Sequence, residues 1–149
     1  MRFSVIIPTC GRPESLRACL HALAPDRQRD AALVAGSAAT SERGSEAIYE
    51  VIVTDDHPTQ SVAAFVRAEA PWAIHVPGPG RGPAANRNRG ARRARHDWLA
   101  FVDDDCVPCN RWLGAFRDAA ERSPDTVVLE GQTHASGPRH HIMESAPIN

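Results

Sequence analysis

Three consecutive carboxylates, Asp103, Asp104 and Asp105, follow an apolar run that begins at Trp98. In an extended chain, residues 103 and 105 point to one side and residue 104 to the other. Mg²⁺ and Mn²⁺ prefer oxygen ligands, typically one or two carboxylates completed by phosphate oxygens and water. We therefore predict that Asp105 holds a divalent metal, with Asp103 on the same side as a second metal ligand or a ribose contact. Asp104 is expected to cap a backbone amide or to face a second ligand group.

The alternative interpretation of these carboxylates is a solvated acidic turn that caps the helix near Asn110. A run of charge considered alone favours that alternative, because such runs usually face solvent. The apolar residues before the run favour a binding site, because ligands of open α/β sheets bind at the carboxyl ends of buried strands.

A second apolar run, residues 49–54, also ends in carboxylates, Asp55 and Asp56. A carboxylate at a strand end is suited to accept hydrogen bonds from a nucleobase or a ribose. Aspartate also commonly caps turns, and the turn at Pro58 follows directly. The sequence leaves both interpretations open for this pair.

Residues 80–90 place a glycine-rich stretch at the start of a predicted helix, and six arginines lie between Arg81 and Arg95. Loop amides and helix N-termini bind anions, and arginine pairs with phosphate through two hydrogen bonds. The spacing is neither that of a Walker loop nor that of a dinucleotide fingerprint. We predict that Arg81, Arg87 and Asn88 contact a ligand, and that the arginines at positions 92, 93 and 95 form a solvated helix face.

The elements that must position these residues follow from hydrophobic periodicity and from the Pro and Gly residues between the apolar runs. Predicted strands cover residues 3–7, 49–54, 72–76, 98–102 and 127–129, and Pro8 is expected to end the first of them. Predicted helices run from residue 13 to about 24 and over 61–70, 84–96 and 110–123. Residues 26–47 are expected to form a surface insertion, with a short helical turn at 31–35. Strands that alternate with helices predict an α/β fold with a mostly parallel sheet and flanking helices.

The composition is that of one globular domain, with 149 residues, 42% of them hydrophobic, and a formal net charge of −1. A charge near zero and an aromatic content of 5% argue against a nucleic-acid partner. No apolar run is long enough to span a membrane, and the N-terminus lacks the pattern of a signal peptide. The expected location is the cytoplasm, where the four cysteines would stay reduced. Membrane association is expected only through regions outside these residues.

Four segments, taken in order and spacing, resemble family 2 glycosyltransferases of the GT-A fold: residues 4–9, 51–56, 80–90 and 98–105. The resemblance covers residues 3 to about 130 and implies a Rossmann-like half that binds a nucleotide-diphosphate-sugar donor. It implies that Pro8 and Thr9 lie beside the nucleobase, that Asp56 contacts the base, and that residues 81–88 line the donor site. It also implies that residues 103–105 are the DXD metal motif. The donor-binding residues predicted in this way are Pro8, Thr9, Arg12, Asp56, Arg81, Arg87, Asn88, Asp103 and Asp104, and the predicted metal ligands are Asp105 and Asp103.

The chemistry implied by the resemblance is glycosyl transfer to a saccharide or another hydroxyl-bearing acceptor, with inversion at the anomeric carbon. Mn²⁺ or Mg²⁺ would bridge the diphosphate, and a carboxylate base would deprotonate the acceptor. Two departures from the family pattern stand out. His57 and Pro58 replace the Gly-Ser that often follows the acidic pair. The family's base lies C-terminal to the matched region, and neither Glu130, Glu144 nor the histidines at 134, 140 and 141 replace it convincingly.

The expected organisation is a donor-binding domain over residues 1–130, followed by a tail over 131–149 that begins an acceptor-binding region. Because no base is assigned, a non-catalytic nucleotide-sugar-binding module and a truncated fragment stay open as alternatives. A nucleotidyltransferase is less favoured. That class would need Lys or Arg in a glycine-rich loop after the first strand, and residues 9–13 offer only a poor version of it.

Overall fold

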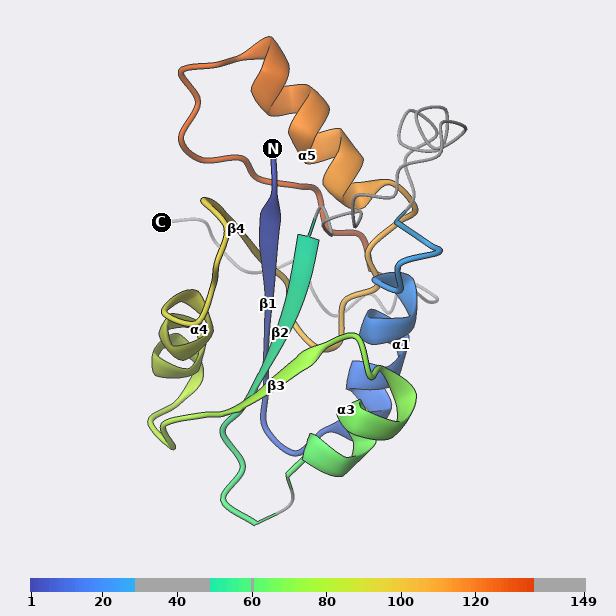
Figure 1. Cartoon of the computed structure of the whole chain (residues 1–149), viewed down its shortest axis with the longest axis vertical. Coiled ribbons are helices and arrows are strands. Elements are labelled where there is room, and N and C mark those ends of the chain that lie inside the picture. Colours follow the sequence, from blue (N-terminus) through green and yellow to red (C-terminus); the bar gives the residue numbers. More distant parts are fainter. Residues whose placement is uncertain (29–48, 60, 136–149) are drawn as a thin grey trace, which may run out of the picture.

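The computed structural model describes residues 1–28, 49–59 and 61–135. Within them, four strands form one parallel sheet in the order β3-β2-β1-β4, accompanied by four helices (Figure 1). The strands are β1 (Phe3–Thr9), β2 (Tyr49–Asp55), β3 (Ile74–Pro77) and β4 (Trp98–Phe101). The helices are α1 (Pro13–Ala22), α3 (Ala63–Glu69), α4 (Pro83–Ala91) and α5 (Trp112–Arg122). The predicted α/β fold with a mostly parallel sheet is confirmed.

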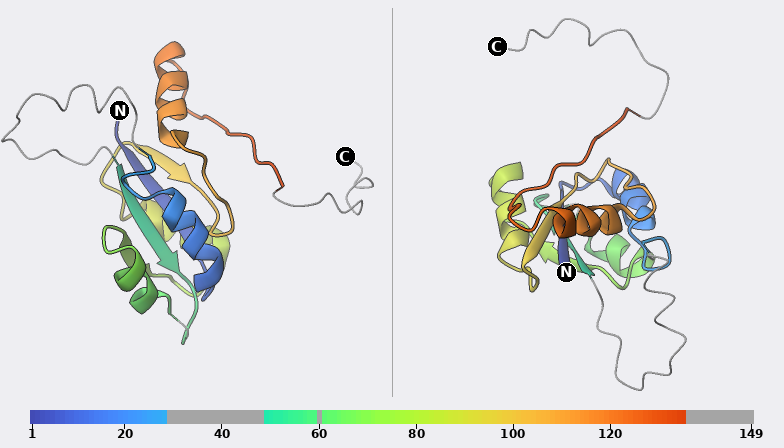
Figure 2. Two further views of the ribbon diagram at one scale, coloured as in Figure 1. Left: turned by 90° about the vertical axis from the view of Figure 1, so that its right-hand side faces the viewer. Right: turned by 90° about the horizontal axis from the view of Figure 1, so that it is seen from above.

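Helices cover both faces of the sheet. α1 and α3 lie on one face and α4 on the other (Figures 1 and 2). The alternation of side chains in the central strands matches this arrangement, since Val5 and Val51 pack in the cluster with α1, whereas Ile6 lies against Gly90 of α4. β1 and β2 are therefore buried on both faces, which explains their continuous apolar sequences.

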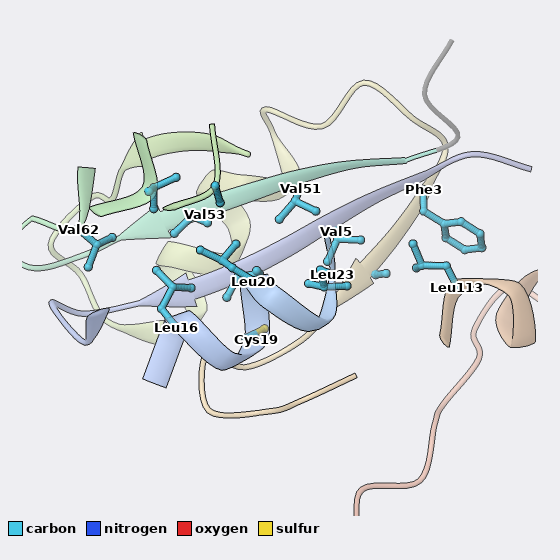
Figure 3. Close-up of a cluster of buried hydrophobic side chains, with 14 residues drawn as sticks. Phe3, Val5, Leu16, Cys19, Leu20, Leu23, Val51, Val53, Val62 and Leu113 are labelled. Atoms are coloured by element: carbon cyan, nitrogen blue, oxygen red, sulfur yellow. The ribbon is translucent and has the colours of Figure 1, made fainter. Parts of the chain in front are cut away.

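The main hydrophobic core lies between the sheet and the helices α1 and α3, with Leu113 of α5 at one end (Figure 3). Leu16, Leu20 and Leu23 are at most 2% exposed, and their spacing of three or four residues forms one helical stripe. Cys19 belongs to the same stripe, and its burial raises the pKa of its thiol to about 12. This thiol therefore packs as a small apolar side chain.

Gly90 lets α4 approach the sheet closely. A Cβ at this position would lie 2.5 Å from Ile6 Cγ2 and 3.2 Å from Thr54 Cγ2. Any larger residue at position 90 would push the helix away from β1 and β2. The helix carries the predicted ligand contacts, so this glycine helps to set the distance between them and the strand ends.

The strand ends meet at one edge of the sheet. Thr9 of β1 pairs with Asp55 of β2, so these two strands end level with each other. β4 pairs with β1 only as far as Ile6 and Phe101, but the chain continues beside β1, and the Val102 amide donates to the Ile6 carbonyl. This register brings the residues that follow β4 next to the end of β1.

The prediction that Pro8 ends the first strand is wrong, because β1 continues through it to Thr9. The Ile6 carbonyl faces β4, and Pro8, two residues further on, faces the same side. β4 pairing has already ended at that level. The missing N–H of Pro8 therefore leaves no ladder hydrogen bond unmade.

Residues 127–129 do not form the predicted strand. Val127 is 86% exposed and Val128 is 77% exposed, and no strand of the described residues pairs with them. An apolar triplet becomes a strand only where another strand supplies hydrogen-bond partners. The helix predicted over 84–96 also ends earlier, at Ala91.

Gln28, near the start of the predicted surface insertion, is buried. Its side-chain amide donates to the carbonyls of Ala22 at 2.9 Å and Cys109 at 3.0 Å, and so ties the end of α1 to the segment before α5. The rest of the predicted insertion, including the helical turn at 31–35, lies almost entirely outside the described residues. The tail predicted over 131–149 is described only as far as residue 135, where it has no regular element.

A buried carboxylate, Glu50, ties together the end of the sheet opposite the candidate site. Its oxygens accept hydrogen bonds from the Ser4 hydroxyl at 2.6 Å, from the Arg95 amide at 2.8 Å and from Arg95 Nε at 2.9 Å. Burial by itself would raise the pKa of Glu50, but these hydrogen bonds and the Arg95 charge outweigh it and lower the pKa. Arg95 was predicted to belong to a solvated helix face, and its side chain instead spans from the surface to this carboxylate.

The lowered pKa of Glu50 predicts a stability that depends on pH. The ionised form is favoured in the folded state, so its contribution is present above the ordinary glutamate pKa and is lost as the pH falls through the lower folded pKa. Free energies of unfolding, measured by urea titration from pH 7 down to about pH 3, should therefore decline more steeply for the natural chain than for Glu50→Gln. Parallel curves would contradict this role of Glu50.

Candidate functional site

Asp104 is the fully buried member of the three carboxylates, with a side-chain exposure of 0%. Its Oδ2 accepts hydrogen bonds from the Thr9 hydroxyl at 2.6 Å and from Arg12 Nε at 3.1 Å, and its Oδ1 accepts from the Arg12 guanidinium. Both oxygens are thus engaged by side chains, and the predicted backbone cap is not what the structure contains. The guanidinium binds the carboxylate through two hydrogen bonds, the strongest common geometry for this pair.

Asp103 and Asp105 flank this buried residue and are both exposed. The predicted extended segment is not what the structure contains, because residues 104 and 105 lie in a turn in which the Cys106 amide donates to the Asp103 carbonyl at 3.1 Å. Asp103 forms an ion pair with Arg87, whose guanidinium reaches across from α4. Asp105 has one weak contact, from Cys106 Sγ at 3.9 Å. The two outer carboxylates are therefore exposed to solvent, whereas the middle one is buried in the fold.

The two carboxylates at the end of β2 accept hydrogen bonds from backbone amides of different loops. Asp55 is buried, and its carboxylate accepts hydrogen bonds from the amides of Gly11 at 3.0 Å, His57 at 3.2 Å and Val62 at 2.8 Å. Asp55 therefore caps the turn before Pro58. Of the two interpretations that the sequence left open, a ligand contact and a turn cap, Asp55 fits the turn cap.

Asp56 holds the glycine-rich loop that precedes α4. Its Oδ1 accepts from the Gly80 amide at 2.6 Å and its Oδ2 from the Gly82 amide at 2.8 Å. Both glycines have positive φ, 65° and 86°, which disfavours any residue with a side chain there. A Cβ on Gly78 would lie 2.5 Å from Asp56 Oδ1, so this third glycine lets the loop close over the carboxylate.

Asn86 is a residue of this region that the sequence interpretation missed. It is 2% exposed, and its Nδ2 donates to the carbonyl oxygens of Thr9 at 3.1 Å and Thr54 at 2.9 Å, where β1 and β2 end. Asn86 thereby fixes α4 to the strand ends. The sequence offered only a weak signal, an asparagine four positions before a glycine and so on the same face of the predicted helix.

Five of the predicted ligand contacts line one or the other of two concavities, to which α4 contributes different residues. The larger one, about 1290 Å³, is lined by Arg87, Asp103 and Asp105 at one end and by apolar residues of β4, α5 and the following segment. The smaller one, about 390 Å³, is lined by Arg81 and Asn88 among others. The remaining predicted residues, Pro8, Thr9, Arg12, Asp56 and Asp104, line neither of these two.

The donor set near Asp103 and Asp105 suits a hard divalent cation held jointly with a ligand. No group of three or more His, Cys, Asp or Glu side chains in the described part of the chain could enclose a metal ion unaided. Two exposed carboxylates completed by phosphate oxygens and water are the usual arrangement for Mg²⁺. Burial together with the charges of Asp105 and Asp103 raises the pKa of the neighbouring Cys106 thiol.

The order of the strands places these carboxylates at a recognised type of binding position. From β1 the chain proceeds outward to β2 and β3 in one direction, and β4 then lies on the other side of β1. The connection through α4 crosses the opposite face from α1 and α3 (Figure 1). Ligands of open α/β sheets bind outside the carboxyl ends of the strands at such a reversal. Thr9 and Asp104 meet at this point, with the outer two carboxylates beside them.

Two curated proteins are similar to this chain in sequence. The glycosyltransferase AglE of Haloferax volcanii is 30% identical over 114 residues, which are 74% of this chain and 32% of that protein. An uncharacterized glycosyltransferase of Haemophilus influenzae is 31% identical over 102 residues, which are 68% of this chain and 29% of that protein. The chain thus spans about a third of the length of these relatives. None of its described helices is both long and apolar enough to cross a bilayer.

Solved structures of TarS from S. aureus share the fold. TarS residues 1–349 in complex with UDP match with a TM-score of 0.61 and 20% identity, over 82% of this chain and 32% of that one. A second structure of TarS residues 1–349 matches with a TM-score of 0.58 and 22% identity, over 82% of this chain and 33% of that one. The model of the family described as glycosyl transferase family 2 matches residues 4–146, nearly the whole sequence. This chain therefore belongs to glycosyl transferase family 2.

Proposed function

We propose that this chain binds the nucleotide-diphosphate-sugar donor of a glycosyltransferase that transfers the sugar, with inversion, to a hydroxyl group of an acceptor. The observation that carries the proposal is the position of the three carboxylates at the strand-order reversal between β1 and β4. Family membership and a fold shared with a glycosyltransferase solved with UDP support it.

The diphosphate end of the donor is assigned to Asp103, Asp105 and Arg87. Asp103 and Asp105 would hold Mn²⁺ or Mg²⁺, which when bound supplies positive charge to the diphosphate leaving group. Arg87 now neutralises Asp103 and lines the same concavity, so its guanidinium is placed to exchange that carboxylate for a phosphate oxygen. Exposure of both carboxylates permits this exchange.

The nucleoside end is assigned to the strand ends beside this turn. The Asp56 amide donates to the Thr9 carbonyl at 3.0 Å, and the Thr9 hydroxyl donates to Asp104. Asp56, Thr9 and Asp104 thus form a row across the ends of β2, β1 and the segment after β4, with Pro8 beside it. Arg12 and Asp104 act in this row as positioning residues, because their charged groups bind each other.

In the proposed reaction the acceptor oxygen forms a bond to the anomeric carbon as the bond from that carbon to the diphosphate oxygen breaks. The acceptor proton goes to a carboxylate base. We assign no described residue of this chain as that base. The chain's own contribution is to hold the donor and to place cationic and metal-binding groups at the leaving phosphate.

Calorimetric titration with UDP, GDP and dTDP sugars, each with and without Mn²⁺, tests the proposal. We expect one of these nucleotides to bind, and its affinity to increase when Mn²⁺ is present. Binding that is indifferent to Mn²⁺, or binding of none of the three, would contradict the site. Release of free sugar or glycosyl transfer by the 149-residue chain would separate an enzyme from a module that only binds.

Asp56→Ala is expected to weaken nucleotide binding about tenfold or more, both with and without Mn²⁺. The variant removes the proposed carboxylate contact to the base and releases the amides of Gly80 and Gly82, and hydrogen bonds to a charged group are worth about 1.5–3 kcal/mol. Titration of the variant beside Glu69→Ala, an exposed carboxylate on α3, provides the matched comparison. An unchanged affinity in Asp56→Ala would reject the contact.

A further inference from the structure

A group of arginines on α4 and its preceding loop has no carboxylate partner among the described residues. Three other arginines each form an ion pair with a carboxylate: Arg12 with Asp104, Arg87 with Asp103 and Arg95 with Glu50. Arg81, Arg89 and Arg92 do not pair with any acidic side chain in residues 1–28, 49–59 and 61–135, and all three are exposed. These three line the smaller concavity, which we call the α4 groove.

The α4 groove is lined by residues of α4 and of the loop that leaves β3. Figure 1 shows this loop leading from β3 into α4 at the side of the sheet away from α1 and α3. Ala85, Asn88, Arg89 and Arg92 recur at the three- and four-residue spacing that places side chains on one helical stripe. Asn86, by contrast, faces the sheet, and Arg87 reaches Asp103 in the other concavity. The helix therefore presents separate surfaces to the two concavities.

The lining of the α4 groove favours an anion and disfavours a nucleoside. Its members are three arginines, one asparagine, and small or apolar residues: Pro77, Gly78, Pro79, Arg81, Ala85, Asn88, Arg89 and Arg92. No carboxylate lies among them to neutralise the guanidinium groups, and no aromatic ring is present on which a base could stack. The positive charge is local, because the whole chain has a formal net charge of −1.

We propose that the α4 groove is a phosphate-binding site, separate from the metal-dependent site at Asp103 and Asp105. Guanidinium groups match the tetrahedral oxygens of phosphate and bind them through paired hydrogen bonds, and several cations suit a dianion. A volume of about 390 Å³ exceeds that of a phosphate ion, so the groove also accommodates a phosphomonoester with part of the group that carries it. The site goes beyond the proposed donor function and does not rest on it.

Backbone ¹⁵N chemical shifts of the full chain, titrated with inorganic phosphate at low salt, test this site. We expect saturable shifts at Gly78, Ala85 and Arg89, and at least a tenfold loss of affinity in Arg89→Gln/Arg92→Gln. Arg93→Gln is the matched control, because Arg93 is also exposed and follows the same helix but does not line the groove. Glycerol 3-phosphate, titrated in parallel, distinguishes a phosphomonoester from free phosphate as the better ligand of the same residues.

Three results would overturn the proposal. The first is an unchanged affinity in the double variant, and the second is an equal loss in Arg93→Gln, which would indicate general charge attraction. The third is loss of the phosphate shifts when UDP and Mn²⁺ saturate the chain, which would make the groove part of the donor site. UDP titration of the double variant is expected to give the natural affinity. A failure of UDP to bind the natural chain would reject the proposed function while leaving the phosphate shifts to be judged separately.

Discussion

Asp104→Ala is expected to lower the free energy of unfolding by about 2–3 kcal/mol. The variant leaves the Thr9 hydroxyl and the Arg12 guanidinium without the buried carboxylate that both now bind. Loss of one partner of a buried charge pair is costly because the other charge loses its counterpart. The expected loss stays below that of a fully enclosed pair because the Arg12 side chain is 54% exposed and regains contact with water. Urea unfolding, followed by circular dichroism, measures the change.

Asp104→Asn tests whether the negative charge or the size of the side chain stabilises the contacts with Thr9 and Arg12. The amide keeps the size of the side chain and one acceptor oxygen, so we expect an intermediate loss of stability. Arg12→Gln should show a loss that is not additive with Asp104→Ala, because both variants remove the same interaction. Additive losses in the double variant, or a stability of Asp104→Ala equal to that of the natural chain, would show that the carboxylate does not join β1 to the segment after β4.

Asp105→Ala is expected to behave in the opposite way: the fold stays intact and metal-dependent nucleotide binding falls by at least about a hundredfold. Asp105 is exposed, and among the described residues its carboxylate contacts only the Cys106 thiol, weakly, so its removal breaks no hydrogen bond of normal length there. Loss of groups that merely orient a metal ligand already costs about 10- to 100-fold in affinity, and loss of a direct ligand should cost more. Calorimetry with UDP and Mn²⁺, together with urea unfolding, gives both readings.

Asp125→Ala provides the control for a general change of charge, because Asp125 is an exposed carboxylate that does not line the larger concavity. It should leave both stability and metal-dependent binding unchanged. If Asp105→Ala unfolds the chain, the acidic turn is structural at this position as well. If it binds nucleotide and metal like the natural chain, Asp105 is not the metal ligand.

The neighbouring carboxylates Asp104 and Asp105 show which features of the site the local sequence pattern can predict. Local alternation distinguished the middle carboxylate from its two neighbours, although residues 104 and 105 lie in a turn and not in the extended segment that the alternation assumes. It could not identify the partners of Asp104, because Thr9 and Arg12 lie more than ninety residues earlier in the chain. Shorter separations, of 24 to 77 residues, also hid the loop amides that Asp56 binds and the two carbonyls that Asn86 joins.

Short-range physical chemistry was sufficient for the fold class, because the apolar runs that become β1, β2 and β4 and the helical spacing of α1 are properties of neighbouring residues. It failed where a residue's state depends on what lies beside it in space. Residues 127–129 have the composition of a strand but no partner strand among the described residues, and Pro8 is tolerated within β1 because β4 has ended at its level.

The acidic turn after β4, the residues from which a binding site was first inferred, combines both kinds of information. Its residue types and its position after an apolar strand indicated a metal and phosphate site. Only the tertiary structure revealed that its middle carboxylate is buried between Thr9 and Arg12, and that Arg87 and Arg81 line different concavities. Charge and alternation are properties of neighbouring residues in the sequence. Strand order and register, by contrast, bring distant residues together. They therefore decide which cation lies beside a buried carboxylate and which side of a helix meets the sheet.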